Sequence, residues 1–366
     1  MRQSKIFKIS VIVFSFLSLS LFIYAPTTYS ASAPQTKITN IRITGHMPVG
    51  NFNTTAAERF IKEAEKMSNG SLKFTYYPAG QLAMDVKAIE LCQRGAIEMA
   101  QIFPSRAVGM IPESDLVYPF FDDPDWYARR MFDVSSGGGL WYKIIIPKFQ
   151  QKNLHLLPGP LYSPEHSMLT KKKIVTMDDY KGLKIRTSSR AMGAAVESWG
   201  AQGVVMTSSE TYQGLQRNVI DGALSGLTSI RSRKWFEVAD HVQLLWMACT
   251  SLDTAVNLNF WKSLTPEHRK IIEEAMRSST IWAWEQSIEE VKGDIEFLKS
   301  KKLQVVDFKK TYPAEWGKMK DSSMAALAKV IGPTVGKATW DQAMQFMNAT
   351  EKSNKTWQEI LKTMAW

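Results

Sequence analysis

Arg186 is the residue whose type and position best suit the binding of a small anion. It ends the run GLKIR (182–186), in which apolar and basic residues alternate. A strand covered by helices on both faces is almost continuously apolar, so this alternation indicates that one side of the strand meets polar groups. The guanidinium is permanently charged, and its planar fork of donors fits both oxygens of a carboxylate. An edge-strand arginine that faces water gives the same pattern, so the residues alone leave both interpretations open.

The segment around Arg186 predicts alternating strands and helices. Apolar periodicity and stop signals indicate strands at 183–187, 203–206 and 219–224 and helices at 191–199 and 210–217. Thr207 and Glu210 have the spacing of a capping box at the start of the second helix. Short connections of this kind predict a parallel or mixed sheet wrapped by helices, which binds ligands beyond the carboxyl ends of its strands. Arg186 lies at such an end.

Several motifs follow one another in a fixed order. GLKIR is followed by a helix, a Gly-Ala turn into an apolar strand, SETYQGLQ and VIDGA, and the earlier part of the chain carries YPAGQLAMDVKAIELCQRGAIEMAQI. This order resembles that of the solute receptors of tripartite ATP-independent periplasmic (TRAP) transporters, of the dicarboxylate-receptor type. The resemblance runs over nearly the whole mature chain.

The resemblance implies a fold and a function. The fold is that of two-domain α/β periplasmic solute-binding proteins, in which each domain is a mixed sheet flanked by helices and a long helix spans both domains. The function is that of a non-catalytic receptor, in which Arg186 clamps the carboxylate of an organic acid anion. The receptor delivers this anion to the membrane subunits of a TRAP transporter.

Further ligand-binding residues are implied by matching the motifs position by position, and all are expected to face the cleft: His46, Phe103, His166, Met168, Ser208 and Ser225. Ser225 replaces an asparagine that is usual in relatives that bind sugar acids or C4 acids, and His166 lies near the place of a second arginine. The absence of this amide and of a permanent second cation argues against a polyhydroxylated or dianionic ligand, while Phe103 and Met168 offer apolar surface. The chain is therefore predicted to bind a monocarboxylate with an apolar or aromatic body. Ordinary core packing is the competing interpretation of the apolar residues.

Residues 1–33 have the pattern of a cleaved signal peptide. A basic start is followed by an apolar stretch at 9–23 and a small-residue cluster at 30–33. The apolar stretch is short for a membrane span. Because no cysteine precedes Cys92, attachment of a lipid is not expected, and the product is predicted to be periplasmic. Removal of this segment takes away three positive charges and no negative ones, so the net charge of +10 becomes +7.

The remaining chain is long enough for two domains. The first is predicted at 34–158 plus about 252–285, and the second at 159–251 plus about 286–366. Residues 38–102 read as a βαβαβ unit. Apolar runs predict strands at 115–121 and 241–250, hinge segments are expected at 158–165 and 248–253, and Thr265-Pro266-Glu267 opens a long helix to residue 298. Two helices after residue 319 are expected to complete the second domain.

Fingerprints of other functions are missing. In the run 222–226, GALSG, the serine stands one place too late for a nucleophile elbow, and the five histidines form no HExxH motif. No phosphate or dinucleotide loop is found, so no cofactor is predicted, and Cys92 and Cys249 are expected to be buried free thiols. The basic runs at 171–173 and 231–234 belong to no nucleic-acid module. Two alternatives stay open, namely the binding protein of an ATP-driven importer and a periplasmic enzyme acting on a carboxylic acid.

Overall fold

The structure is a computed structural model that describes residues 38–117, 121 and 123–364. The predicted signal peptide lies outside these residues. Among the described helices, none combines the length and the apolar character that a membrane span requires.

The first sheet has five strands in the order β2-β1-β3-β12-β4. Its strands are β1 (Thr39–Thr44), β2 (Leu72–Tyr77), β3 (Met99–Ile102), β4 (Leu154–Leu157) and β12 (Asp253–Asn257), and α1 (Phe52–Met67) and α2 (Asp85–Gln93) connect the first three. β1 pairs in parallel with β2 and β3, whereas β12 is antiparallel to β3 and β4. The predicted βαβαβ unit is therefore confirmed. Asn51 caps α1 through its side chain, and Asn69 and Gly70 take positive φ values of 49° and 78° just after its end.

The second sheet has six strands in the order β13-β10-β6-β9-β7-β8. Its strands are β6 (Ser167–Thr170), β7 (Lys184–Thr187), β8 (Gln202–Val205), β9 (Gly222–Ser225), β10 (His241–Leu244) and β13 (Gln304–Asp307), with α5 (Arg190–Glu197), α6 (Thr211–Gln216) and α7 (Leu227–Ser232) between them. β7 is parallel to both β8 and β9, and β6 is antiparallel to β9 and β10. The sheet is mixed, as predicted. The two sheets with flanking helices match the predicted fold class, while the residue boundaries of the domains stay a prediction.

Two short strands pair where the chain passes from one sheet to the other. β5 (Leu161–Ser163) and β11 (Thr250–Ser251) form an antiparallel pair inside the two predicted hinge segments. The backbone N–H of Gly159 donates to Asp253 Oδ1 at 2.8 Å. A Cβ atom on Gly159 would lie 1.9 Å from the carbonyl oxygen of Leu252, so only glycine permits this approach. The two crossings thus run side by side.

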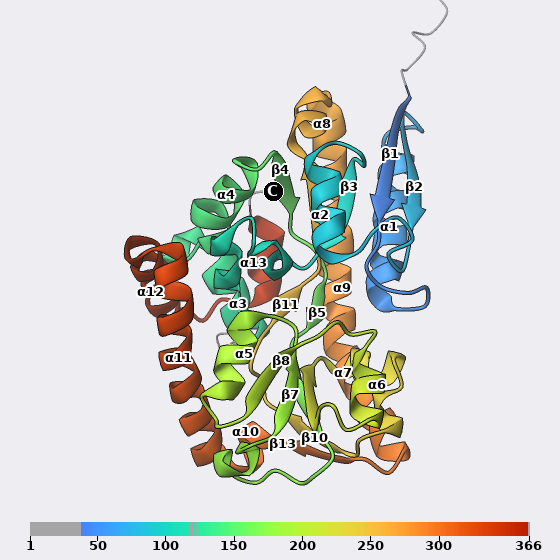
Figure 1. Ribbon diagram of the computed structural model, residues 1–366. Helices are drawn as coiled ribbons and strands as arrows, with labels where there is room; N and C mark the ends of the chain where they lie inside the picture. Colours follow the sequence, from blue (N-terminus) through green and yellow to red (C-terminus); the bar gives the residue numbers. More distant parts are fainter. Residues whose placement is uncertain (1–37, 118–120, 122, 365–366) are drawn as a thin grey trace, which may run out of the picture. The chain divides into compact units, whose positions relative to one another are not determined.

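The long helix predicted from Thr265 is α9 (Pro266–Ser300), which has 35 residues. Thr265 accepts a hydrogen bond from the His268 amide, and Pro266 and Glu267 occupy the first turn, where the helix dipole favours an acidic side chain. Figure 1 shows α9 running from α8 (Leu258–Ser263) past β5 towards α7, and it packs against α1, β5, α7 and β13. Trp284 on α9 donates its Nε1–H to the carbonyl of Gly159 at 3.2 Å, so the helix is bonded directly to a hinge segment.

Several local predictions were wrong. Residues 112–117 form a 3₁₀-helix, η2 (Pro112–Val117), in place of the described part of the strand predicted at 115–121, because Pro112 starts a helical turn more readily than a strand. The strand predicted at 241–250 ends at Leu244, since Trp246 takes a φ of 52° that no strand accommodates. Cys249 consequently lies just before β11, and both it and Cys92 are buried free thiols, as predicted.

The capping box predicted at α6 is only half formed. Glu210 accepts from the Thr207 amide at 3.2 Å, but the Thr207 hydroxyl donates to the same carboxylate, and the helix begins at Thr211.

The C-terminal region contains α10 (Phe308–Thr311), α11 (Pro313–Val335), α12 (Lys337–Thr350) and α13 (Trp357–Thr363). Two helices were predicted after residue 319, whereas parts of three helices, α11, α12 and α13, lie there. α12 and α13 pack against α3 (Pro124–Phe132), which lies in the segment predicted for the first domain. The aromatic rings of Trp284 and Trp357 lie 5.5 Å apart and join α13 to α9. The remaining described elements are η1 (Pro104–Ala107), η3 (Val134–Ser136), η4 (Trp141–Ile145), α4 (Ile146–Gln150), η5 (Met177–Tyr180) and η6 (Trp235–Glu237).

Candidate functional site

Arg186 lies near the carboxyl end of β7 and is 1% exposed. Its Nε–H donates to the carbonyl of Met206 at 2.9 Å, Nη1–H to the carbonyl of Leu224 at 3.2 Å, and Nη2–H to Ser208 Oγ at 3.0 Å. The guanidinium also lies 5.7 Å from the centre of the Trp235 ring. A buried charge requires such partners. These contacts hold the plane of the guanidinium in one orientation.

Ser208, Ser225 and His166 lie near this arginine or on neighbouring strand ends. Ser208 follows β8 and contacts Arg186 directly. Ser225 ends β9, is buried, and is paired with Ser167 on β6. Burial and the charge of Arg186 lower the pKa of His166 to about 3. His166 is therefore neutral at physiological pH and does not replace a second cation.

His46 and Phe103 come together from the first sheet. Their rings lie 4.9 Å apart in an edge-on arrangement, and the Phe103 ring lies 5.1 Å from that of Tyr162 on β5. Burial lowers the pKa of His46 to about 4; Asp85 opposes this shift, and Arg106 and Arg233 add to it. The imidazole is therefore neutral near pH 7 and can act as donor or acceptor.

Met168 does not face the site, contrary to the sequence-based expectation. Its side chain is fully buried in the hydrophobic core and it pairs with Leu224, whereas Arg186 pairs with Ala223. Directly paired residues point to the same face of a sheet and successive residues alternate. Met168 and Arg186 therefore lie on opposite faces, and Met168 is a packing residue.

A cavity of about 380 Å³ brings His46 and Ser208 together. His46 follows β1 of the first sheet and Ser208 follows β8 of the second, so residues far apart in the sequence share one hollow beyond the ends of the strands. Phe103 contacts His46, and Arg186 contacts Ser208. The structure thus connects four of the seven predicted residues through one cavity and its immediate neighbours.

Three charged residues of this cavity were missed in the sequence: Asp85, Arg106 and Arg233. Arg106 lies on η1, with its Nε 3.3 Å from Asp85 Oδ1, and its Nη1–H donates to the carbonyl of Ser188 at 2.7 Å. Ser188 follows β7, so Arg106 links the two sheets' loops. Arg233 follows α7 in a basic run that resembles solvated surface. Nothing in the local pattern separates Arg233 from its exposed neighbour Lys234.

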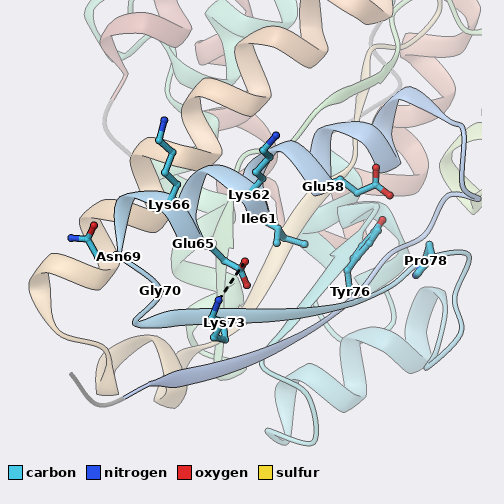
Figure 2. Close-up of a pocket in the computed structure, with 10 residues that line it drawn as sticks. All are labelled: Glu58, Ile61, Lys62, Glu65, Lys66, Asn69, Gly70, Lys73, Tyr76 and Pro78. Atoms are coloured by element: carbon cyan, nitrogen blue, oxygen red, sulfur yellow. Dashed lines mark ion pairs between the residues drawn. The ribbon is translucent and has the colours of Figure 1, made fainter. Parts of the chain in front are cut away.

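A larger hollow of about 750 Å³ lies elsewhere, over α1 and β2. Figure 2 shows its lining, in which Lys73 pairs with Glu65 at 4.0 Å while Lys62 and Lys66 extend from the helix. None of the predicted site residues lines it, and the charges on its wall have both signs. We therefore place the candidate site at the smaller cavity. Within the described residues, no group of three His, Cys, Asp or Glu side chains is arranged to hold a metal ion.

The chain is similar to known proteins in both sequence and fold. The model of the family "Bacterial extracellular solute-binding protein, family 7" matches residues 45–329. The C4-dicarboxylate-binding periplasmic protein DctP of Rhodobacter capsulatus is 31% identical over 234 residues, which cover 62% of this chain and 67% of that protein. The sialic acid-binding periplasmic protein SiaP of Vibrio cholerae is 24% identical over 252 residues, covering 68% and 77%.

The fold is similar to that of a TRAP periplasmic solute-binding protein from Desulfovibrio salexigens with bound orotic acid. The TM-score is 0.76 at 19% identity, and the match covers 85% of this chain and 98% of that one. At this identity the likeness concerns the fold.

Proposed function

This chain belongs to the bacterial extracellular solute-binding proteins of family 7, the solute receptors of TRAP transporters, and we propose that it binds an organic acid anion whose carboxylate is held by Arg186. The receptor then delivers this anion to the membrane subunits of its transporter. The observation that carries the proposal is the position of Arg186 at a strand end, bonded to Ser208 on the wall of the cavity. Ligands of open α/β sheets bind at such ends.

The contacts of Arg186 support a binding role. The carbonyls of Met206 and Leu224 accept two of its N–H groups and fix the guanidinium before any ligand arrives. A group that is already oriented loses little conformational entropy on binding. The carboxylate of the ligand then meets a permanent charge in a largely buried setting, where charge-assisted hydrogen bonds are strong.

The class of acid is a separate part of the proposal. The sequence predicts a monocarboxylate with an apolar body, and the rings of His46, Phe103 and Tyr162 offer a surface for such a body. Two premises of that prediction have changed, however, because Met168 is a core residue and Arg106 and Arg233 bring two permanent cations to the cavity. The monocarboxylate class stays a prediction.

Ligand binding is proposed to stabilise a closed arrangement of the two sheets. The crossing segments around β5 and β11 are proposed as the hinge, because they are short segments that lie where the chain passes from one sheet to the other. A ligand shifts this equilibrium only by the contacts that it makes in one arrangement and not in the other.

The place of action is proposed to be the periplasm, after cleavage of the signal peptide between about residues 31 and 35. Intact-mass measurement of the protein from a periplasmic extract checks this. A mass that retains residues 1–25, or one that includes acyl chains, would contradict the proposal.

The main experiment identifies the ligand and then tests its anchor. Ligand retained by the purified protein is released by denaturation and identified by mass spectrometry, and its affinity for the wild type and for Arg186→Lys is measured by calorimetry. Lysine cannot supply two parallel donors, so affinity should fall at least about tenfold. Arg217→Lys, an exposed substitution, is the matched control. Unchanged affinity of Arg186→Lys would remove Arg186 from the site.

A further inference from the structure

Arg233 is a half-buried cation of the cavity that forms no ion pair with a described residue. It lies just after α7 and lines the cavity together with His46 and Ser208. Its Nε is buried without a hydrogen-bond partner among the described residues, and no ion pair involves it there. The other arginine of the cavity, Arg106, lies 3.3 Å from the Asp85 carboxylate, and the neighbouring Arg231 pairs with Asp294 at 3.0 Å. Arg233 therefore differs from both.

A buried donor without an acceptor costs free energy, and natural proteins rarely leave one in that state. Asp85, the carboxylate of the cavity wall, is paired with Arg106 and lies 3.8 Å from His46 Nδ1. His46 Nδ1 is itself buried without a hydrogen-bond partner in the described part of the chain. Asp85 Oδ1 also has no hydrogen-bond partner among the described residues and is the acceptor near His46. No such acceptor is found for Arg233 Nε in the described part of the chain, and an oxygen of the bound molecule would supply one.

Arg233 and Arg186 approach a common residue. Burial raises the pKa of Tyr162, and the positive charges of Arg233 and Arg186 both oppose this shift. Ser208 contacts Arg186 and lines the cavity in which Arg233 lies. Ser208 therefore connects the cavity that Arg233 lines with the guanidinium of Arg186.

We infer that Arg233 is a specificity-determining residue, which pairs with a second anionic group at the end of the ligand remote from Arg186. The inference depends on the proposed role of Arg186 for the first carboxylate. The second group is an oxyanion, and a carboxylate is the form in which we test it. This inference is the alternative to the predicted monocarboxylate, and the test below decides between the two. His46, neutral and adjacent, completes the recognition of this group through one hydrogen bond.

The test uses matched pairs of acids that differ only in the second carboxylate: succinate with butyrate, glutarate with pentanoate, and adipate with hexanoate. Affinities are measured by calorimetry and thermal shift on the wild type, Arg233→Ala, Arg233→Lys and the exposed control Lys234→Ala. The wild type should bind at least one diacid about ten- to a hundredfold more tightly than its partner. Arg233→Ala should lose this preference and keep the affinity for the monoacid, Arg233→Lys should recover part of it, and Lys234→Ala should match the wild type.

Two results would overturn the inference. One is that the wild type binds the diacid and the monoacid of every pair with equal affinity, or binds neither. The other is that Arg233→Ala keeps the wild-type preference in affinity for the diacid. Arg186→Lys separates this from the proposed function, because it should weaken both acids of a pair. If only Arg186→Lys weakens binding, the anchor stands and the inference about Arg233 is wrong. If only Arg233→Ala does so, the anchor is wrong and Arg233 remains a binding residue. Circular dichroism of each variant confirms that it is folded.

Discussion

Arg106 forms a bridge between the two sheets that can be removed without changing the hinge. Its Nη1–H donates to the carbonyl of Ser188 at 2.7 Å, while its Nε lies 3.3 Å from Asp85 Oδ1. Arg106 and Asp85 follow elements of the first sheet, and Ser188 follows β7 of the second. Separation of the sheets would break the bond to Ser188 and leave the pair with Asp85 intact. We predict that Arg106→Ala shifts the protein towards an open arrangement.

The size of this shift follows from the kind of bond. A hydrogen bond from a charged donor contributes about 1.5 to 3 kcal/mol. The Arg106 side chain is 19% exposed, so water partly replaces the lost partner and about 1 to 2 kcal/mol is a reasonable figure. That corresponds to a change of about 5- to 30-fold in the ratio of closed to open molecules. If the ligand binds the closed form, its apparent affinity falls by up to the same factor.

The assay combines calorimetry with small-angle X-ray scattering of the free protein. Arg106→Ala should bind the native ligand more weakly and show a larger radius of gyration, while the exposed Arg94→Ala should not. Arg106 also lines the cavity, so a second variant separates closure from contact. Thr228 accepts a hydrogen bond from Asn51 Nδ2 at 3.2 Å and does not line this cavity, and Thr228→Ala should shift scattering and affinity in the same direction, less strongly. Unchanged scattering and affinity for Arg106→Ala would refute the reasoning.

Two further predictions concern stability and are measured by chemical denaturation. Gly159→Ala should lower the free energy of unfolding by about 1 to 3 kcal/mol, because its Cβ would meet the Leu252 carbonyl at 1.9 Å. The control Gly293→Ala, in an open helical position, should instead raise the free energy of unfolding by about 0.5 to 1 kcal/mol. Equal effects of the two substitutions would contradict the explanation. Burial lowers the pKa of His155 to about 4, so the folded protein keeps the ring neutral while the unfolded chain protonates it below about pH 6.5. The contribution of the neutral ring to the free energy of unfolding is complete above pH 6.5 and is lost as the pH falls towards 4. Between pH 7.5 and pH 5, the free energy of unfolding of His155→Phe should therefore fall by about 2 kcal/mol less than that of the wild type. An identical pH dependence of the two proteins would show that His155 does not titrate in this way.

Local elements of this protein are determined by the sequence itself. Thr265 caps the N-terminus of α9, and Pro266 and Glu267 suit its first turn, independently of the rest of the chain. The end of α1 is likewise local, because Asn69 and Gly70 are residue types that adopt positive φ readily. The alternation of strands and helices around Arg186 is of the same kind, because apolar periodicity is a property of neighbouring residues. This is why a mixed sheet wrapped by helices and the position of Arg186 at a strand end were predictable, whereas the two-domain arrangement was implied by the family resemblance.

Tertiary structure decided which side chains face the cavity. Met168 and Arg186 both lie on short strands, and only the pairing of β6 with β9 and of β9 with β7 puts them on opposite faces. Arg106 and Arg233 could not be told from solvated arginines, since their surroundings come from loops that follow different sheets. Strand pairing and burial depend on residues tens of positions apart, and a pattern read along the chain carries no information on which distant segments meet.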